Sequence, residues 1–345
     1  MNKKIFVINL IYFIAMISIA IIFALGYLGI FTSDIIASSL IQVVVMLAIP
    51  LLLYTLLISK NVKQTFKDTG FKKINSSMII TCLLLGVVMY FMNTFISNFF
   101  HSIIYMLGYE NISSGETITL NYAFLLKEFV LTAILPAICE EFLHRGILLH
   151  AGKKCGNTRY SLLVSSILFG LMHLNINQFF YATILGALMG YINLVTDSIY
   201  PSIIIHFINN FLSIYFQYGQ YMDWPLANIL NSIESLLLSN IFIYIVACAA
   251  SVFVLITLFI LLTKRLSMLR AKSEVHSIIK ELHLSSLPIH EVQAKVNLAN
   301  EIIQTSKQPR IQKGTHFSIT ENSFMILSII LGTIITISSF IWGII

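Results

Sequence analysis

Apolar stretches long enough to cross a lipid bilayer recur along most of this chain. A hydrocarbon core of about 30 Å takes about 20 apolar residues of helix. Of the 345 residues, 57% are hydrophobic and only 10% are charged, which excludes the surface of a water-soluble globular protein. We therefore predict an all-α fold, a polytopic transmembrane helical bundle of about eight or nine spans. The candidate spans fall at approximately 5–31, 35–59, 76–100, 127–150, 159–175, 178–196, 199–216, 235–263 and 323–345.

The distribution of basic residues among the connections between spans predicts how the protein is oriented in the membrane. Lys and Arg occur in every second connection, whereas the opposite connections hold acidic residues, and only Lys127 lies near that side. The positive-inside rule then places the N-terminus in the cytosol and the C-terminus outside, in the cell membrane. The first run is predicted to be a retained helix, because it is too long for a signal peptide. The acidic residues on the outer side are Asp34, Glu110, Glu116, Asp223 and Glu234.

Composition divides the chain into four parts. Residues 1–75 are predicted to form two transmembrane helices and a cytosolic loop, and residues 76–263 the membrane-embedded core. Residues 264–322 mix basic and acidic side chains with an amphipathic pattern, which predicts a cytosolic helical segment that could bind a regulator or anionic headgroups, or serve as an ordinary solvated hairpin. Residues 323–345 form a last span. Within the core, GALMG at 186–190 is a GxxxG motif that lets two helices approach closely.

Polar side chains inside the apolar helices indicate where a functional site could lie. Each costs free energy in the membrane unless it is paired or takes part in function. Glu141 and Arg145 are four residues apart on one helix face, with the acid first, so we expect an ion pair. Glu140 faces another direction and has no evident cation, as expected for a general base or acid rather than a packing element.

Two further segments bring polar groups to the same level of the bilayer. His173 ends the run FGLMH, and His206 and Asn210 share a helix face at i and i+4. Counted from the ends predicted to be cytosolic, Glu140, His173 and Asn210 each lie about 13 or 14 residues, or about 20 Å, along their helices. We therefore expect these groups to meet in one site.

The motifs Glu140-Glu141-x-x-x-Arg145, Phe169-x-x-x-His173 and His206-x-x-x-Asn210 occur complete and in this order, each on a separate predicted helix. At these residues the chain resembles the CAAX prenyl endopeptidase and bacteriocin-processing family (CPBP, Abi) of intramembrane proteases. The resemblance covers about residues 76–216.

This resemblance implies an endopeptidase, a hydrolase that cuts peptide bonds near the membrane. Glu140 would activate water, His173 would hold or polarise that water, and His206 and Asn210 would stabilise the oxyanion. Glu141, Arg145 and Phe169 would take supporting roles, and His144 falls on a free position of the motif. The implied substrate is a membrane peptide or a lipidated, lipoprotein-like protein, with the bilayer as the other partner and no nucleic acid.

Whether a metal takes part stays open at this point. Glu140, His173 and His206 match the two His and one carboxylate of a catalytic zinc site. If Glu140 were a ligand, however, no second base would remain except Glu141, which Arg145 is expected to hold as an ion pair. This slightly favours a metal-free glutamate mechanism.

Two functions from other classes remain as alternatives. One is a proton-coupled transporter that uses Glu140 and the histidines as a proton relay. The other is a non-catalytic bacteriocin-immunity or scaffold protein that has kept the motifs for folding. The sequence shows no transporter-type repeat, which disfavours the first.

Overall fold

The computed structural model describes residues 2–30, 34–110, 122–155, 157–238, 241–284, 288–305 and 318–344, and these are almost entirely helical. Glu116, residues 285–287 and residues 306–317, for which the sequence makes predictions, lie outside the described residues. Six described helices are long and apolar enough to span a membrane, and α8 is a shorter apolar helix. The prediction of an all-α polytopic bundle is confirmed, and the chain is an integral membrane protein.

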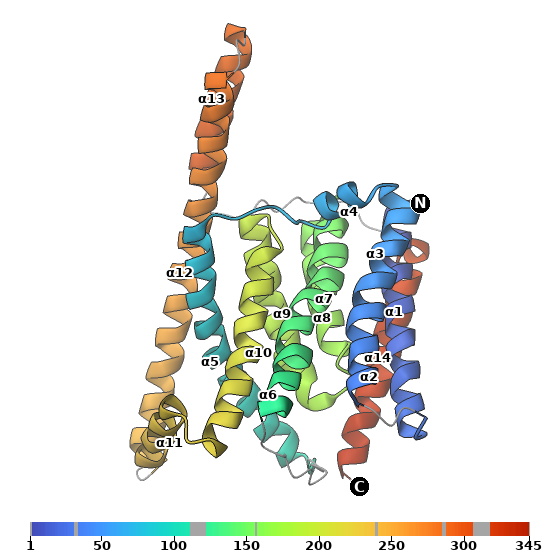
Figure 1. Ribbon diagram of the computed structural model, residues 1–345, viewed down its shortest axis with the longest axis vertical. Helices are drawn as coiled ribbons and strands as arrows, with labels where there is room; N and C mark the ends of the chain where they lie inside the picture. The colour runs from blue at the N-terminus through green and yellow to red at the C-terminus, as the bar shows by residue number, and fades with distance from the viewer. Residues whose placement is uncertain are drawn as a thin grey trace.

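The helices form one bundle with a long projection (Figure 1). The N-terminal part comprises α1 (Lys3–Tyr27), α2 (Asp34–Ser39), η1 (Leu40–Ala48), α3 (Ile49–Tyr54), η2 (Thr55–Ser59) and α4 (Val62–Asp68). The central part comprises α5 (Ser76–Met106), α6 (Tyr122–Glu128), η3 (Phe129–Ile134), α7 (Leu135–Glu141), η4 (Phe142–Ala151), α8 (Thr158–Leu171), α9 (Ile176–Thr196) and α10 (Tyr200–Tyr221). The chain ends with α11 (Pro225–Leu238), α12 (Ile241–Leu284), α13 (Ile289–Thr305) and α14 (Ile319–Ile344).

Two segments are continuous helices that change their winding around a proline. In residues 34–59 and 122–151, wide π-helical turns (η1, η3) precede Pro50 and Pro136, each of which lies in the first turn of a short α-helix. Proline donates no hydrogen bond and its ring crowds the preceding turn, which a local π adjustment relieves. Glu140 and Glu141 therefore end a short α-helix between two π segments, a position at which functional groups often occur.

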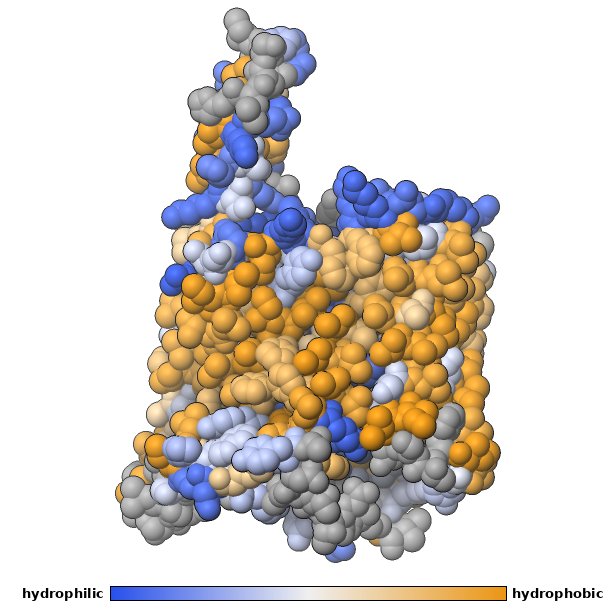
Figure 2. All heavy atoms as spheres, viewed as in Figure 1, coloured by the Kyte–Doolittle hydropathy of each residue, from blue (hydrophilic) through white to orange (hydrophobic). Residues whose placement is uncertain are grey.

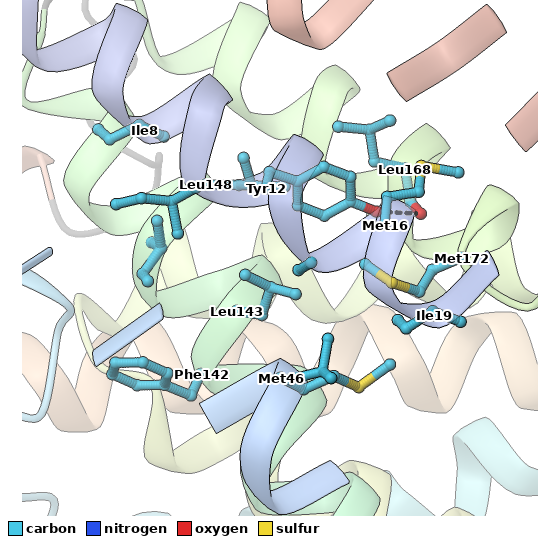
Figure 3. Packing of buried hydrophobic residues seen from close by; sticks show 14 of the residues in the cluster. Ile8, Tyr12, Met16, Ile19, Met46, Phe142, Leu143, Leu148, Leu168 and Met172 are labelled. Atoms are coloured by element: carbon cyan, nitrogen blue, oxygen red, sulfur yellow. Dashed lines mark hydrogen bonds between the residues drawn. The ribbon is translucent and has the colours of Figure 1, made fainter. Parts of the chain in front are cut away.

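The segment α7–η4 lies between two hydrophobic clusters. On one side, Tyr12 and Met16 of α1 pack with Phe142 and Leu143, and the Tyr12 hydroxyl donates to the carbonyl of Leu168 at 2.8 Å (Figure 3). On the other side, a second cluster joins residues of α5, α9, α10 and α12 with one residue of α8. Both clusters fix the helices that carry the motifs.

The GxxxG prediction is confirmed at Gly186. A Cβ there would lie 3.4 Å from the Ser166 backbone and 3.2 Å from the Phe169 ring, so α8 and α9 pack almost backbone to backbone. The missing side chain leaves the space in which the Phe169 ring sits.

The helix α12 passes the boundary expected at 263/264. It continues without a break to Leu284, because residues 241–284 contain neither glycine nor proline. The expected cytosolic segment thus begins as the continuation of a membrane helix, with α13 packed beside the projecting part (Figure 1). The division into four parts otherwise stays a prediction.

The two ends of the bundle differ in charge. Figure 2 shows a broad hydrophobic belt, with hydrophilic residues gathered at the end where the N-terminus and α4 lie. There, a hollow of about 950 Å³ is lined by five lysines: Lys63, Lys67, Lys72, Lys153 and Lys154. Burial raises the pKa of the Asp197 carboxyl, but the neighbouring Lys153 ammonium, 2.6 Å away, outweighs this effect and the net shift is downward. The C-terminus lies at the opposite end (Figure 1).

Candidate active site

One cavity of about 360 Å³ contains the four side chains that the sequence predicts to act together. Glu140, His173, His206 and Asn210 all line it. Phe169 lines it as well, whereas Glu141 and Arg145 are fully buried behind it. The further lining residues are Asn93, Leu131, Thr132, Pro136, Gln178, Tyr181, Ala182, Leu185, Asn209 and Ser213.

Glu140 has a hydrogen-bond donor that the sequence motifs do not predict. The side-chain Nε2 of Gln42, in η1, donates to Glu140 Oε1 at 2.8 Å in a buried contact. The expectation that Glu140 lacks a cation agrees with the ion pairs of the described residues, since none of them involves Glu140. An amide in an apolar run is itself a costly polar group, so the rule applied to Glu140 would also have identified Gln42.

Glu141 joins two of the motifs. Its Oε1 accepts a hydrogen bond from Arg145 Nη1 at 2.9 Å, which confirms the predicted pair, and lies 2.9 Å from Nδ1 of His206 on α10. Glu141 and Arg145 have no exposed side-chain surface. Since an ionised carboxylate only accepts, Nδ1 of His206 carries the proton and Nε2 is left for other partners. The pairing with His206 spans 65 residues and was not predicted.

The Phe169 ring is the common neighbour of these polar groups. Its face lies 4.2 Å from the guanidinium carbon of Arg145, and the rings of His173 and His206 meet it edge to face at centroid distances of 5.4 and 5.9 Å. Arg145 Nη2 also donates to the carbonyl of Gly186 at 3.2 Å. Arg145 is thus held by a carboxylate, a carbonyl and a π face, which compensate its charge inside the bundle.

His173 does not lie within a helix, so that part of the prediction is wrong. The helix α8 ends at Leu171, and His173 occupies the turn before Leu174, whose φ is +53°. Asn175 then caps α9 with its side chain. The turn places His173 at the end of α8, beside the cavity.

Asn210 is held at both ends of its amide. Its Nδ2 donates to the carbonyl of Thr132 at 2.8 Å, and its Oδ1 accepts from Asn209 at 3.1 Å. An amide nitrogen carries two protons, so Nδ2 retains one that these contacts do not use. Asn93 and Asn209 each present a buried Oδ1 for which the described part of the chain supplies no hydrogen-bond donor.

His144 is fully buried and does not line the cavity. Its Nδ1 lies 2.8 Å from the backbone carbonyl of Glu140, and its Nε2 lies 3.4 Å from the hydroxyl of Tyr12. That His144 stays outside the reacting set remains a prediction.

Glu140, His173 and His206 share the cavity but do not converge as metal ligands. Among the described residues, no three His, Cys, Asp or Glu side chains are grouped so that they could hold a metal ion. As placed, the donor set does not fit a zinc centre.

A known family model matches the central segment of the chain. Residues 122–212 match the Rce1-like family model, described as type II CAAX prenyl endopeptidase Rce1-like. The resemblance drawn from the motifs is thereby confirmed, over a shorter stretch than the expected 76–216. The match supports a CAAX-type membrane endopeptidase at the level of the family. Comparison with curated proteins and with solved structures gives no match.

Proposed function

We propose that this protein is a membrane-embedded endopeptidase that hydrolyses peptide bonds of membrane-associated peptides or lipidated proteins. The observation that carries the proposal is the meeting of Glu140, His173, His206 and Asn210 on one cavity. A carboxylate, two imidazoles and an amide at one place suit the activation of water and the polarisation of a carbonyl. The Rce1-like match of residues 122–212 supports the same reaction class.

In the proposed mechanism, Glu140 takes a proton from a water molecule that His173 holds. Oε1 of Glu140 is occupied by Gln42, so Oε2 is the oxygen that receives the proton. The resulting hydroxide attacks the carbonyl carbon of the scissile peptide bond. Glu140 then passes the proton to the leaving amine as the C–N bond breaks.

The negative charge on the carbonyl oxygen needs hydrogen-bond donors. The second Nδ2 proton of Asn210 supplies one, and His206 Nε2 supplies another when the ring carries both protons. Glu141, 2.9 Å from His206 Nδ1, holds this ring in place. Loss of one oxyanion donor typically lowers kcat by about 100- to 1,000-fold.

The orientation follows from the charged ends. We propose that the lysine-rich end faces the cytosol, so the N-terminus is cytosolic and the C-terminus is outside the cell membrane. Labelling of single cysteines placed at the two termini with a membrane-impermeant reagent tests this.

The test compares newly generated peptide termini in membranes that contain the wild type or Glu140→Gln at matched protein level. Glu291→Gln, the same change at an exposed site on α13, is the control. We expect the termini to vanish with Glu140→Gln, to persist with Glu291→Gln and to persist in a chelator.

Two results would contradict this expectation. Termini that vanish in the chelator would assign a metal to the reaction. Identical termini from wild type and Glu140→Gln, both folded and abundant, would refute proteolysis and favour the transporter or scaffold alternative.

A further inference from the structure

The proposed general base is held from a part of the chain that lies outside the Rce1-like match. Gln42 belongs to η1 of the N-terminal span 35–59, whereas the match begins at residue 122. Its Nε2 donates to Glu140 Oε1 at 2.8 Å. Both side chains are buried, with exposed fractions of 9% for Gln42 and 7% for Glu140.

Gln42 approaches Glu140 from behind the cavity. Glu140 lines the cavity and Gln42 does not. The amide therefore binds one carboxylate oxygen on the protein side. The other oxygen of Glu140 remains for water or substrate.

Among the described residues, the Gln42 amide has no partner besides Glu140 that would fix its orientation. Gln42 Oε1 is buried, and no hydrogen-bond donor from the described residues reaches it. If the amide were turned over, its oxygen would face the carboxylate and two acceptors would meet in an apolar environment. The contact with Glu140 thus determines the orientation of the Gln42 amide. The same contact orients the Glu140 carboxylate.

We propose that Gln42 is a positioning residue that fixes the Glu140 carboxylate for proton transfer, so that the N-terminal span completes the active site. This inference rests on the proposed function of Glu140. A general base acts efficiently only within hydrogen-bond reach of the proton it removes, and small displacements of a reacting group are costly. Without Gln42, the Glu140 side chain loses the donor that selects its rotamer.

Two substitutions at Gln42 separate loss of the donor from loss of packing. Gln42→Met keeps the length of the side chain and removes the N–H groups. Gln42→Asn keeps the amide but withdraws it by one methylene. Asn9→Leu is the matched control, because it removes a buried side-chain hydrogen bond away from the cavity. In that bond, Asn9 Nδ2 of α1 donates to the backbone carbonyl of Glu321 in α14 at 3.0 Å.

Steady-state cleavage by the full-length protein in lipid nanodiscs gives the first measurement. We expect Gln42→Met and Gln42→Asn to lower kcat by about tenfold or more, the size of a hydrogen bond to a charged group, while KM stays within about twofold. Asn9→Leu should leave both constants unchanged at the assay temperature. A purely structural role would not produce this separation of kcat from KM.

A double-mutant cycle of thermal unfolding tests the contact without relying on activity. It compares Gln42→Met, Glu140→Gln and the double variant. We expect Gln42→Met to lower Tm more in the wild type than in Glu140→Gln. Additive Tm shifts, or an unchanged kcat in both Gln42 variants, would overturn the proposal. A non-additive cycle with no Glu140-dependent cleavage would retain the pairing and refute the proteolytic function.

Discussion

The buried carboxylate of Glu141 offers the most direct test of how the site is held together. Its Oε1 serves both Arg145 Nη1 and His206 Nδ1 at 2.9 Å, and neither Glu141 nor Arg145 reaches the surface. Glu141→Gln keeps the shape of the side chain and removes its charge. The guanidinium of Arg145 then lies inside the bundle without the carboxylate that it pairs with.

The magnitude follows from what remains around Arg145. Breaking a buried ion pair by removing one partner costs about 3–5 kcal/mol. The guanidinium would keep its contacts with the Gly186 carbonyl and the Phe169 ring, so we expect the lower end, about 3 kcal/mol. This corresponds to about a 150-fold fall in the ratio of folded to unfolded protein.

The assay is reversible unfolding of Glu141→Gln, Arg145→Met and the double variant. The double variant should be less destabilised than the sum of the single variants, since it leaves no unpaired charge. Asp68→Asn provides the control, because the Lys154–Asp68 pair lies at the exposed end of the bundle and its loss should change the unfolding free energy by less than about 1 kcal/mol. A loss below about 1 kcal/mol in Glu141→Gln, with additive single effects, would refute the reasoning.

Other predictions concern a close packing contact and an ion pair at the lysine-rich end. Gly170→Ala should destabilise the bundle by about 1–3 kcal/mol, because a Cβ there would collide with Thr183 Oγ1 and lie 2.6 Å from the backbone carbonyl oxygen of Phe179. Gly26→Ala, whose added Cβ would have no atom within 4 Å, should be neutral or slightly stabilising in the same unfolding assay. The folded pKa of Asp197 is lowered, so its pairing with Lys153 contributes stability above the unfolded pKa of about 3.9 and loses it as pH falls through the folded value. The Tm deficit of Asp197→Asn should accordingly be present at neutral pH and shrink in acid; a deficit independent of pH would contradict this.

Local sequence rules predicted the features that depend on one helix. The Glu141–Arg145 pair follows from i,i+4 spacing, and the close approach at Gly186 follows from the small residue itself. The family motifs also predicted that Glu140 and His206 meet, and both line one cavity, because each motif marks a helix of that cavity.

Features that depend on contacts between distant helices were not predicted. The bonds from His206 to Glu141 and from Gln42 to Glu140 join segments separated by 65 and 98 residues, and no local pattern encodes their register. The turn at His173 was missed because hydrophobic periodicity does not locate the end of a helix. The π-helical turns before Pro136 were also not predicted, because a pattern with a fixed period of 3.6 residues describes only an α-helix.

The unbroken course of α12 has a mechanical consequence. Its 44 residues extend about 66 Å, roughly twice the thickness of the hydrocarbon core. Inside the bundle, Phe259 and Leu266 pack against α5 and α9, the helices that contribute Asn93 and Tyr181 to the cavity wall. Because the rod has no hinge, a tilt of 10° about one end would swing the other by about 11 Å. A displacement of the projecting end would therefore act first on α5 and α9, the helices that α12 contacts and that contribute to the cavity wall.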